Sequence, residues 1–421
     1  MRRILLIMTL VIAGEMIFGL PFHTARFFRP TMLDVFALSN TQLGDLFAVY
    51  GVFAMLSYFP GGALADRYSA RFLLSASLLA TALGGFAMVT LPGPALLAVI
   101  YGYWGVTTIF LFWGALIRAT RDWGGSKAQG KAFGILEAGR GLVAATVAAG
   151  LVIVFAAMMP DNPHLASAAE QRAAMQMLIL LYSLITLASA LLTWFLVPVP
   201  EPVAAAISRP PFAGMGYVVR RPVVWGQAAV IVCAYCGYKG LDNYSLYAVQ
   251  VLGMDEVAAA GFATWGAYLR PVGALLAGYL ADRFAAAHTI AVLFTVMLMT
   301  YIALSVLDPG SIGMNVILLN LFTSFFAVYA LRGVYFALLE ETGTPKAVTG
   351  AVVGMVSLLG FTPDIFFAPI AGRLLDASPG LPGHQDYFLF LAAVSMLGIL
   401  VIGYLLLINR RDILLRWPAQ T

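Results

Sequence analysis

Four charged residues lie near the middle of long apolar runs: Glu15, Lys239, Asp242 and Arg270. A charge at the centre of a bilayer costs about 2.5–3.5 kcal/mol on insertion scales, so each such residue needs a partner or a function. Arginine offers a planar fork that matches carboxylate, phosphate or sulfonate, and lysine adds a compact point charge. Lys239 and Arg270 are therefore candidates to hold one anion.

The acidic residues at this depth are candidates for proton coupling. Burial makes a carboxylate easier to protonate, and a nearby cation opposes this. An anion that competes for the cation would then link anion movement to proton movement. We expect this role for Glu15 and Asp242, and we add Asp364, which follows Pro363 in another apolar run.

Aromatic residues at similar depth could pack on a small ligand and supply hydroxyl groups. They are Tyr238, Tyr268, Trp265 and Trp113. Pro271 removes a backbone donor directly after Arg270, which predicts a kink there. The alternative to ligand binding is internal pairing, of Lys239 with Asp242 and of Glu15 with Arg270.

The elements that must position these residues are membrane spans. Of the 421 residues, 61% are hydrophobic and 10% are charged, whereas soluble domains average about 25% charged residues. A span needs about 20 apolar residues, and twelve runs qualify: 4–28, 41–65, 71–91, 94–117, 131–157, 174–197, 223–252, 257–281, 288–307, 311–339, 346–374 and 386–408. The sequence predicts an all-α membrane protein with twelve transmembrane helices.

A repeated tetrapeptide divides these spans into two similar halves. Leu64-Ala65-Asp66-Arg67 recurs as Leu280-Ala281-Asp282-Arg283, each with a glycine four residues before its aspartate. We expect two six-helix halves, 1–197 and 223–408, joined by a proline-rich cytoplasmic linker at 198–222 and followed by a tail at 409–421. Two such halves can rock about a site between them. Placing both termini in the cytoplasm puts most of the 24 Lys and Arg residues on that side, as the positive-inside rule requires.

The first copy of the repeat resembles the loop between helices 2 and 3 of the major facilitator superfamily. The resemblance rests on the glycine, the aspartate and the two arginines of that loop: Gly62, Asp66, Arg67 and Arg71. It implies secondary transport by a protein in which Asp66 docks near a helix start, here at Thr344-Pro345. It also implies that these residues, with Asp282 and Arg283 of the second copy, are gate elements.

Other stretches are similar to bacterial organic-anion permeases of that superfamily. Residues 238–245 resemble the helix 7 pattern of organophosphate antiporters, although the basic residue is displaced by about two positions. Phosphate specificity therefore does not carry over. Residues 332–341 and 360–364 resemble a further branch of bacterial permeases. The resemblance implies a multi-pass protein of the bacterial inner membrane, and the interior charges avoid spans 3, 6, 9 and 12, which are outer supports in that family.

The remaining charges are interpreted as gate or interface residues. Glu137 and Arg140 are three apart, which predicts a structural or gate pair. Arg332 with Glu340 and Glu341 predicts a cytoplasmic gate network. His23 and Arg26 could attract anions at the outer mouth, but an interfacial position with the charged ends extending toward water is favoured.

These observations favour a secondary transporter of a small organic anion, working by proton symport or anion exchange. A sensor derived from a transporter, and an exporter of a drug- or lipid-like molecule, remain the alternatives. No nucleotide-binding loop, metal cluster or catalytic constellation is present in the sequence, so we expect no cofactor, metal or enzyme activity. The expected partners are the lipid bilayer, the anion and H+, with no nucleic acid, and we expect a monomer.

Overall fold

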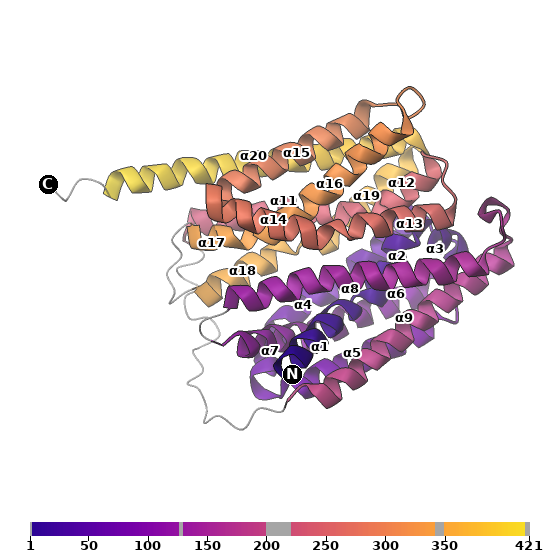
Figure 1. Ribbon diagram of the computed structural model, residues 1–421, viewed down its shortest axis with the longest axis horizontal. Coiled ribbons are helices and arrows are strands. Elements are labelled where there is room, and N and C mark those ends of the chain that lie inside the picture. The colour runs from indigo at the N-terminus through magenta and orange to yellow at the C-terminus, as the bar shows by residue number, and fades with distance from the viewer. Residues whose placement is uncertain (1, 126–128, 199–219, 342–348, 417–421) are drawn as a thin grey trace. The chain divides into compact units, whose positions relative to one another are not determined.

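A computed structural model describes residues 2–125, 129–198, 220–341 and 349–416, and Figure 1 shows the course of its helices. The chain forms two compact units. Unit 1 comprises Met1–Pro202, Leu241–Pro271 and Asp364–His384, and unit 2 comprises Val203–Gly240, Val272–Pro363 and Gln385–Thr421. Two segments of the predicted second half therefore belong to unit 1. The predicted linker lies largely outside the described residues.

The described residues form helices and connecting turns. In unit 1 the helices are α1 (Arg2–Met16), η1 (Gly19–His23), α2 (Thr24–Phe27), α3 (Arg29–Phe36), α4 (Asn40–Arg67), α5 (Ala70–Met88), α6 (Pro94–Val106), η2 (Thr107–Trp113), α7 (Gly114–Gly124), α8 (Gln129–Met158), η3 (Pro163–Leu165), α9 (Ala168–Leu196), η4 (Leu241–Asn243), α12 (Tyr244–Gln250) and α13 (Glu256–Ala267). In unit 2 they are α11 (Pro222–Gly240), α15 (Ala286–Val306), α16 (Met314–Val334), η5 (Tyr335–Ala337), α17 (Leu338–Glu341) and α18 (Thr349–Gly360). Three helices have residues in both units: α14 (Leu269–Phe284), α19 (Pro363–Ala377) and α20 (Leu381–Arg416).

The predicted all-α membrane class is confirmed. Among the described residues, eight helical stretches are long and apolar enough to cross a membrane, and a bent pair in the first span would make a ninth. All twelve predicted runs coincide with one helix or with consecutive short helices. The short helix α3, between the first two predicted spans, was not predicted. The helix of the last span also extends well beyond 408, into the predicted tail.

The first span is bent, where the sequence predicted one continuous helix. Its two parts, Arg3–Met16 and Gly19–Phe27, meet at 42°. Pro21 has no N–H to donate to the carbonyl of Ile17, so the α-helical ladder cannot continue through this turn. A π-helical turn, η1, fills the break and changes the direction in which the following side chains point.

The seventh, eighth and eleventh predicted spans are also interrupted near charged residues. The seventh changes from α11 to the 3₁₀ turn η4 at Leu241, and the eleventh breaks at Phe361 and Thr362, before Pro363 starts α19. The eighth breaks at Tyr268, between α13 and α14. This break lies three residues before Pro271, which has no N–H to donate to the carbonyl of Ala267. The kink predicted at Pro271 itself stays a prediction.

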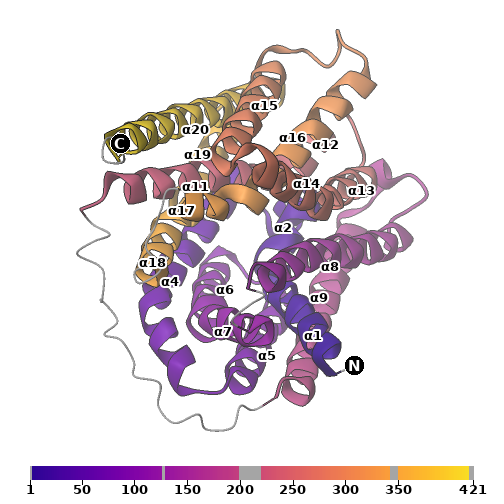
Figure 2. The same cartoon turned by 60° about the vertical axis from the view of Figure 1, so that its left-hand side comes forward.

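Helix packing in unit 1 depends on glycines at crossing points. In Figure 2, α4 passes beside α6, and a Cβ on Gly105 of α6 would lie 2.4 Å from the carbonyl oxygen of Tyr50 in α4.

Serine caps begin two of the long helices: Ser39 at α4 and Ser167 at α9 each accept a backbone N–H in a capping box.

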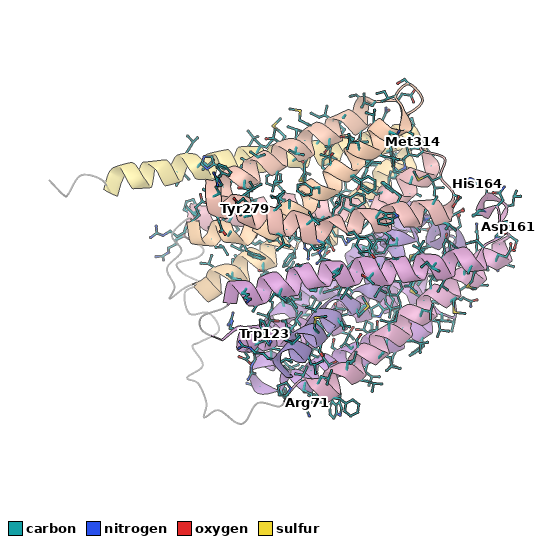
Figure 3. The ribbon with its side chains drawn as sticks, viewed as in Figure 1. Arg71, Trp123, Asp161, His164, Tyr279 and Met314 are labelled. Carbon is teal, nitrogen blue, oxygen red and sulfur yellow. The ribbon has the colours of Figure 1, made fainter. Side chains whose placement is uncertain are left out.

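Unit 2 is held together by similar close contacts. The helices α15 and α16 pack on each other, as do α11 and α18, where Gly360 lies against Ile231. The hydroxyl of Tyr387 in α20 donates to the carbonyl of Gly240 at the end of α11, at 2.6 Å. The exposed Tyr279 lies on α14 in this unit (Figure 3).

The Gly105 crossing gives a direct test of this packing. Gly105→Ala should lower the melting temperature of the purified protein, because forcing a methyl group against backbone atoms costs about 1–3 kcal/mol. Gly150→Ala is the matched control, since a Cβ there meets no atom within 4 Å. Equal melting temperatures for the two variants would show that the crossing is not tight.

Candidate functional site

Glu15 lies at the centre of a buried polar cluster in unit 1. Its Oε1 accepts from Nη1 of Arg270 at 2.9 Å, and its Oε2 accepts from Nε of Arg140 at 2.9 Å. Nε2 of His23 lies 3.3 Å from the same Oε1. The alternative in which Glu15 pairs with Arg270 is therefore present in the structure.

Glu137 joins the same two arginines from the other side. Nη1 of Arg140 donates to its Oε1 at 2.6 Å, and Nη2 of Arg270 donates to its Oε2 at 3.2 Å. Glu15, Arg140, Glu137 and Arg270 thus form a closed ring of alternating charges, which we call the charge ring. The predicted pair of Glu137 and Arg140 is part of this larger structure.

Three features of the chain bring the charge ring together. Gly141 lets Arg270 cross α8, because a Cβ there would lie 2.8 Å from Cγ of Arg270. Gly14 similarly leaves room for the Arg140 side chain, whose Cδ would be 3.4 Å from an added Cβ. The break at Tyr268 lets the chain turn before Arg270 enters the cluster.

The ring is electrically balanced and mostly buried. Two arginines and two glutamates sum to zero, with His23 taken as neutral. Side-chain exposure is 2% for Glu15, 3% for Arg140 and 5% for Arg270, but 39% for Glu137. Removing one member of such a network leaves an uncompensated buried charge, which is strongly destabilising. Glu137 is the one member of the ring with a substantially exposed side chain.

Aromatic rings flank one side of the charge ring. The guanidinium carbon of Arg140 lies 5.6 Å from the Phe18 ring centroid and 5.9 Å from that of Trp113. The predicted site residue Trp113 is therefore beside the ring, and Phe18 was not foreseen. Such positions allow cation–π attraction, worth more when the cation is desolvated.

The other two predicted aromatics of unit 1 lie near the break before Arg270. Tyr268 is half-buried, with its ring centroid 5.8 Å from that of Trp265. Trp265 itself is 69% exposed. Its indole does not line the buried cluster, because Trp265 is on a face of α13 that other side chains leave uncovered.

A second buried ion pair joins the first span to the seventh. Nε of Arg26 lies 2.5 Å from Oδ1 of Asp242, and both side chains are almost fully buried. The hydroxyl of Ser245 donates to the carbonyl of Arg26 at 2.9 Å. The interfacial placement of Arg26 was wrong: the bend at η1 turns this side chain inward, where Asp242 neutralises it. The predicted interfacial placement of His23 was wrong for the same reason, because the bend turns its ring inward toward Glu15.

A polar network at the start of α4 was not predicted. Asp376 accepts from the backbone N–H groups of Asn40 and Thr41 at 3.1 and 2.7 Å, so its carboxylate caps a helix N-terminus. Arg373 pairs nearby with Asp45 at 2.9 Å. Arg373 and Asp376 are three residues apart and so lie on one face of α19, and this spacing was the signal in the sequence that could have indicated the network.

Asp364 lies in the first turn of α19, where a carboxylate is favourable. Its backbone packs against Gly51 of α4, where a Cβ would lie 2.5 Å from the Asp364 carbonyl carbon. The three predicted proton-coupling residues are therefore held differently. Glu15 belongs to the charge ring, Asp242 pairs with Arg26, and Asp364 starts a helix.

Lys239 and Tyr238 belong to unit 2, whereas Arg270 belongs to unit 1. Lys239 is buried, and the guanidinium carbon of Arg332 lies 4.0 Å from the Tyr238 ring centroid. Oε2 of Glu341 accepts from the backbone N–H of Ala287 at 2.9 Å and so caps α15. The gate network of Arg332 with Glu340 and Glu341 stays a prediction.

The predicted gate residues around the repeated tetrapeptide are largely at the surface. Nε of Arg71 donates to the carbonyl of Val197 at 2.5 Å, which ties the start of α5 to the end of α9 (Figure 3). The side chains of Arg67, Asp282 and Arg283 are exposed, and Gly62 has no atom close to where a Cβ would be. The side chains of Asp66 and Glu340, and the segment with Thr344 and Pro345, lie outside the described residues.

The site is built from ion pairs, and the described residues include no group of three His, Cys, Asp or Glu side chains placed to hold a metal ion. A sequence profile of the Major Facilitator Superfamily matches residues 5–361. The chain belongs to this superfamily. It is therefore a membrane transporter of the superfamily, as its sequence motifs suggested.

Relatives of known name agree with this assignment. The chain is 26% identical over 420 residues to inner membrane protein YqcE of Escherichia coli. The aligned region covers 97% of this chain and 95% of YqcE. It is 26% identical over 393 residues to the probable nitrate/nitrite antiporter NarK1 of Thermus thermophilus, covering 86% and 83%. Its fold is similar to the inward-facing, occupied crystal structure of a bacterial homologue of the human lysosomal transporter Spinster. That likeness has a TM-score of 0.75 at 15% identity, over 99% of this chain and 98% of the other.

The pair of Arg26 and Asp242 can be tested by a double-mutant cycle. Asp242→Asn or Arg26→Gln alone should each lower the melting temperature, because a buried charge that loses its counter-ion costs about 3–5 kcal/mol. The double variant should recover much of that loss, since neither charge remains. Strictly additive losses in thermal unfolding would contradict a coupled pair.

Proposed function

We propose that the protein is a secondary active transporter that moves a small organic anion across the bacterial inner membrane together with a proton. The observation that carries this proposal is the charge ring. It concentrates two guanidinium groups at a buried position, and both are already engaged by carboxylates. A buried site built to hold carboxylates is chemically suited to an anionic substrate.

Electrostatic balance supports coupling to a proton. The ring is neutral as it stands, so adding a monoanion would leave one net negative charge in a largely buried site. Uptake of one proton by a ring carboxylate would restore neutrality. Because an uncompensated charge is costly inside a membrane protein, the bound anion and the proton are expected to travel together.

The residues proposed to bind the anion are Arg270 and Arg140, with Trp113 beside them. The two ring carboxylates, Glu15 and Glu137, are the candidates to carry the proton. Lys239 and Tyr238 of unit 2, and Tyr268, stay candidates for substrate contact. Asp242 and Asp364 stay candidates for proton coupling. The name of NarK1 describes that relative as a probable antiporter of inorganic anions, which supports an anionic substrate class here.

The remaining parts of the proposal concern placement in the membrane. The name of YqcE supports the inner membrane as location. The charge distribution of the loops supports cytoplasmic termini. Arg71, Arg67, Asp282, Arg283 and Arg332 remain proposed gate residues, and we propose that the protein works as a monomer.

The transport function is tested by counterflow in proteoliposomes, with gluconate, lactate, isethionate and glycerol 3-phosphate as labelled substrates. Arg270→Gln should reduce uptake of the preferred anion about 10- to 100-fold, since a hydrogen bond to a charged group contributes about 1.5–3 kcal/mol. Arg172→Gln, at an exposed position of α9, should behave as the wild type.

The same assay separates the alternatives. Full uptake by a folded Arg270→Gln variant would contradict an anion site at the charge ring. An anion that raises the melting temperature of the wild type but shows no counterflow would favour the ligand-sensor alternative.

A further inference from the structure

Glu137 occupies an unusual position in the charge ring. Its two carboxylate oxygens bridge one Nη atom of Arg140 and one Nη atom of Arg270. Two guanidinium groups that share an O–C–O unit are the arrangement expected around a bound carboxylate ligand. Here that place is taken by a side chain of the protein itself.

We propose that the Glu137 carboxylate is an internal stand-in for the substrate, and that substrate binds by displacing it from between Arg140 and Arg270. This inference rests on the proposed function and names the subsite and the ligand class. The anionic group of the substrate takes the bridging position, and Glu137 swings away on α8 and takes up the co-transported proton, so that anion and proton together leave the net charge unchanged.

Glu137 is the exchangeable carboxylate of the two in the ring. Glu15 is 2% exposed and contacts Arg140, Arg270 and His23. Glu137 is 39% exposed, and its longer contact, to Arg270, is 3.2 Å. A ligand reaches the exposed Glu137 position before the buried position of Glu15.

The charge that remains defines the ligand class. Without Glu137, the cluster holds Arg140, Arg270 and Glu15, which sum to +1, with His23 neutral beside Glu15. A monoanion restores neutrality, whereas a dianion would leave one uncompensated negative charge in a buried site. The site therefore favours a carboxylate or sulfonate monoanion over a phosphate or dicarboxylate dianion.

The rings beside Arg140 define where the rest of the ligand lies. Phe18 and Trp113 are both half-buried and flank the guanidinium group that Glu137 contacts. An organic monoanion can place its carbon skeleton against these rings. Inorganic anions of the same charge lack that contact and should bind more weakly.

The first experiment measures binding of sodium gluconate, formate and malonate to the full purified chain at constant ionic strength. Glu137→Gln should lower the half-saturating gluconate concentration at least about tenfold, because the internal competitor has lost its charge. Asp161→Asn, at an exposed position in the turn after α8 (Figure 3), is the matched control and should equal the wild type. Gluconate should be preferred to formate, and both to malonate.

Unchanged or weaker gluconate binding by Glu137→Gln would contradict the proposal that Glu137 occupies the substrate position. A preference of the wild type for malonate over gluconate would contradict it as well. Counterflow of gluconate by the wild type, without any gain in the variant, would overturn this inference and leave the proposed transport intact. Failure of the wild type to transport any anion of the panel would instead reject the proposed function.

A second measurement uses the wild-type protein, so it does not depend on the folding of a variant. Carbodiimide labelling, read by peptide mass spectrometry, should increase at Glu137 when isethionate is added, because the displaced carboxyl group leaves its arginines and this sulfonate does not itself consume the reagent. Labelling at Asp161 should not change. Constant or reduced labelling of Glu137 would contradict displacement.

Discussion

The need to neutralise buried charge is the constraint on which the unit 1 site depends. Arg140 and Arg270 are held in an apolar environment only because Glu15 and Glu137 face them in alternation. Each of these charges, without its partners, would carry a large free-energy cost at this depth in the membrane. As a ring they compensate one another, and the arrangement joins the first, fifth and eighth spans at one point.

Several irregularities of the helices serve that ring. The first span bends at η1 and turns His23 toward Glu15 and Arg26 toward Asp242. The eighth span breaks at Tyr268 just before Arg270, and Gly141 lets that arginine lie across α8. Backbone irregularity at membrane depth is tolerated where it is buried in protein. In unit 1, the irregular turns at η1 and Tyr268 lie next to the residues whose side chains contact each other in the cluster.

A balanced ring is also suited to transport. Glu137 has an exposed side chain, whereas its partners Arg140 and Arg270 are buried. A ligand that exchanges with this carboxylate changes the contacts between spans without leaving a bare charge. The pair of Arg26 with Asp242 and the cap of α4 by Asp376 hold other segments of unit 1 to one another. In a superfamily that works by rearranging helices, such polar contacts are suitable points of control.

Much of the fold followed from hydrophobic run length, and Pro271 indicated the region in which the eighth span breaks. Glu15 and Arg270 could be recognised as site candidates because charges in apolar runs are rare. The partnership of Arg140 with them could not be predicted, because counting residues along straight spans placed it at a different depth. Arg26 was misplaced because the bend of the first span, which depends on η1, is not visible as a periodicity. Close approaches such as Gly141 to Arg270 join residues far apart in sequence, and a single sequence gives no signal for them.

Charge movement during transport tests this account most directly. With the protein in proteoliposomes on a solid-supported membrane, a gradient of the transported monoanion should drive uptake without a sustained current. The reason is that one proton accompanies each anion and the ring remains neutral. Uptake of the anion should alkalinise the side from which it leaves, in a ratio of about one proton per anion. A steady current carried by the anion, with no accompanying proton movement, would contradict the neutral charge ring as the basis of coupling.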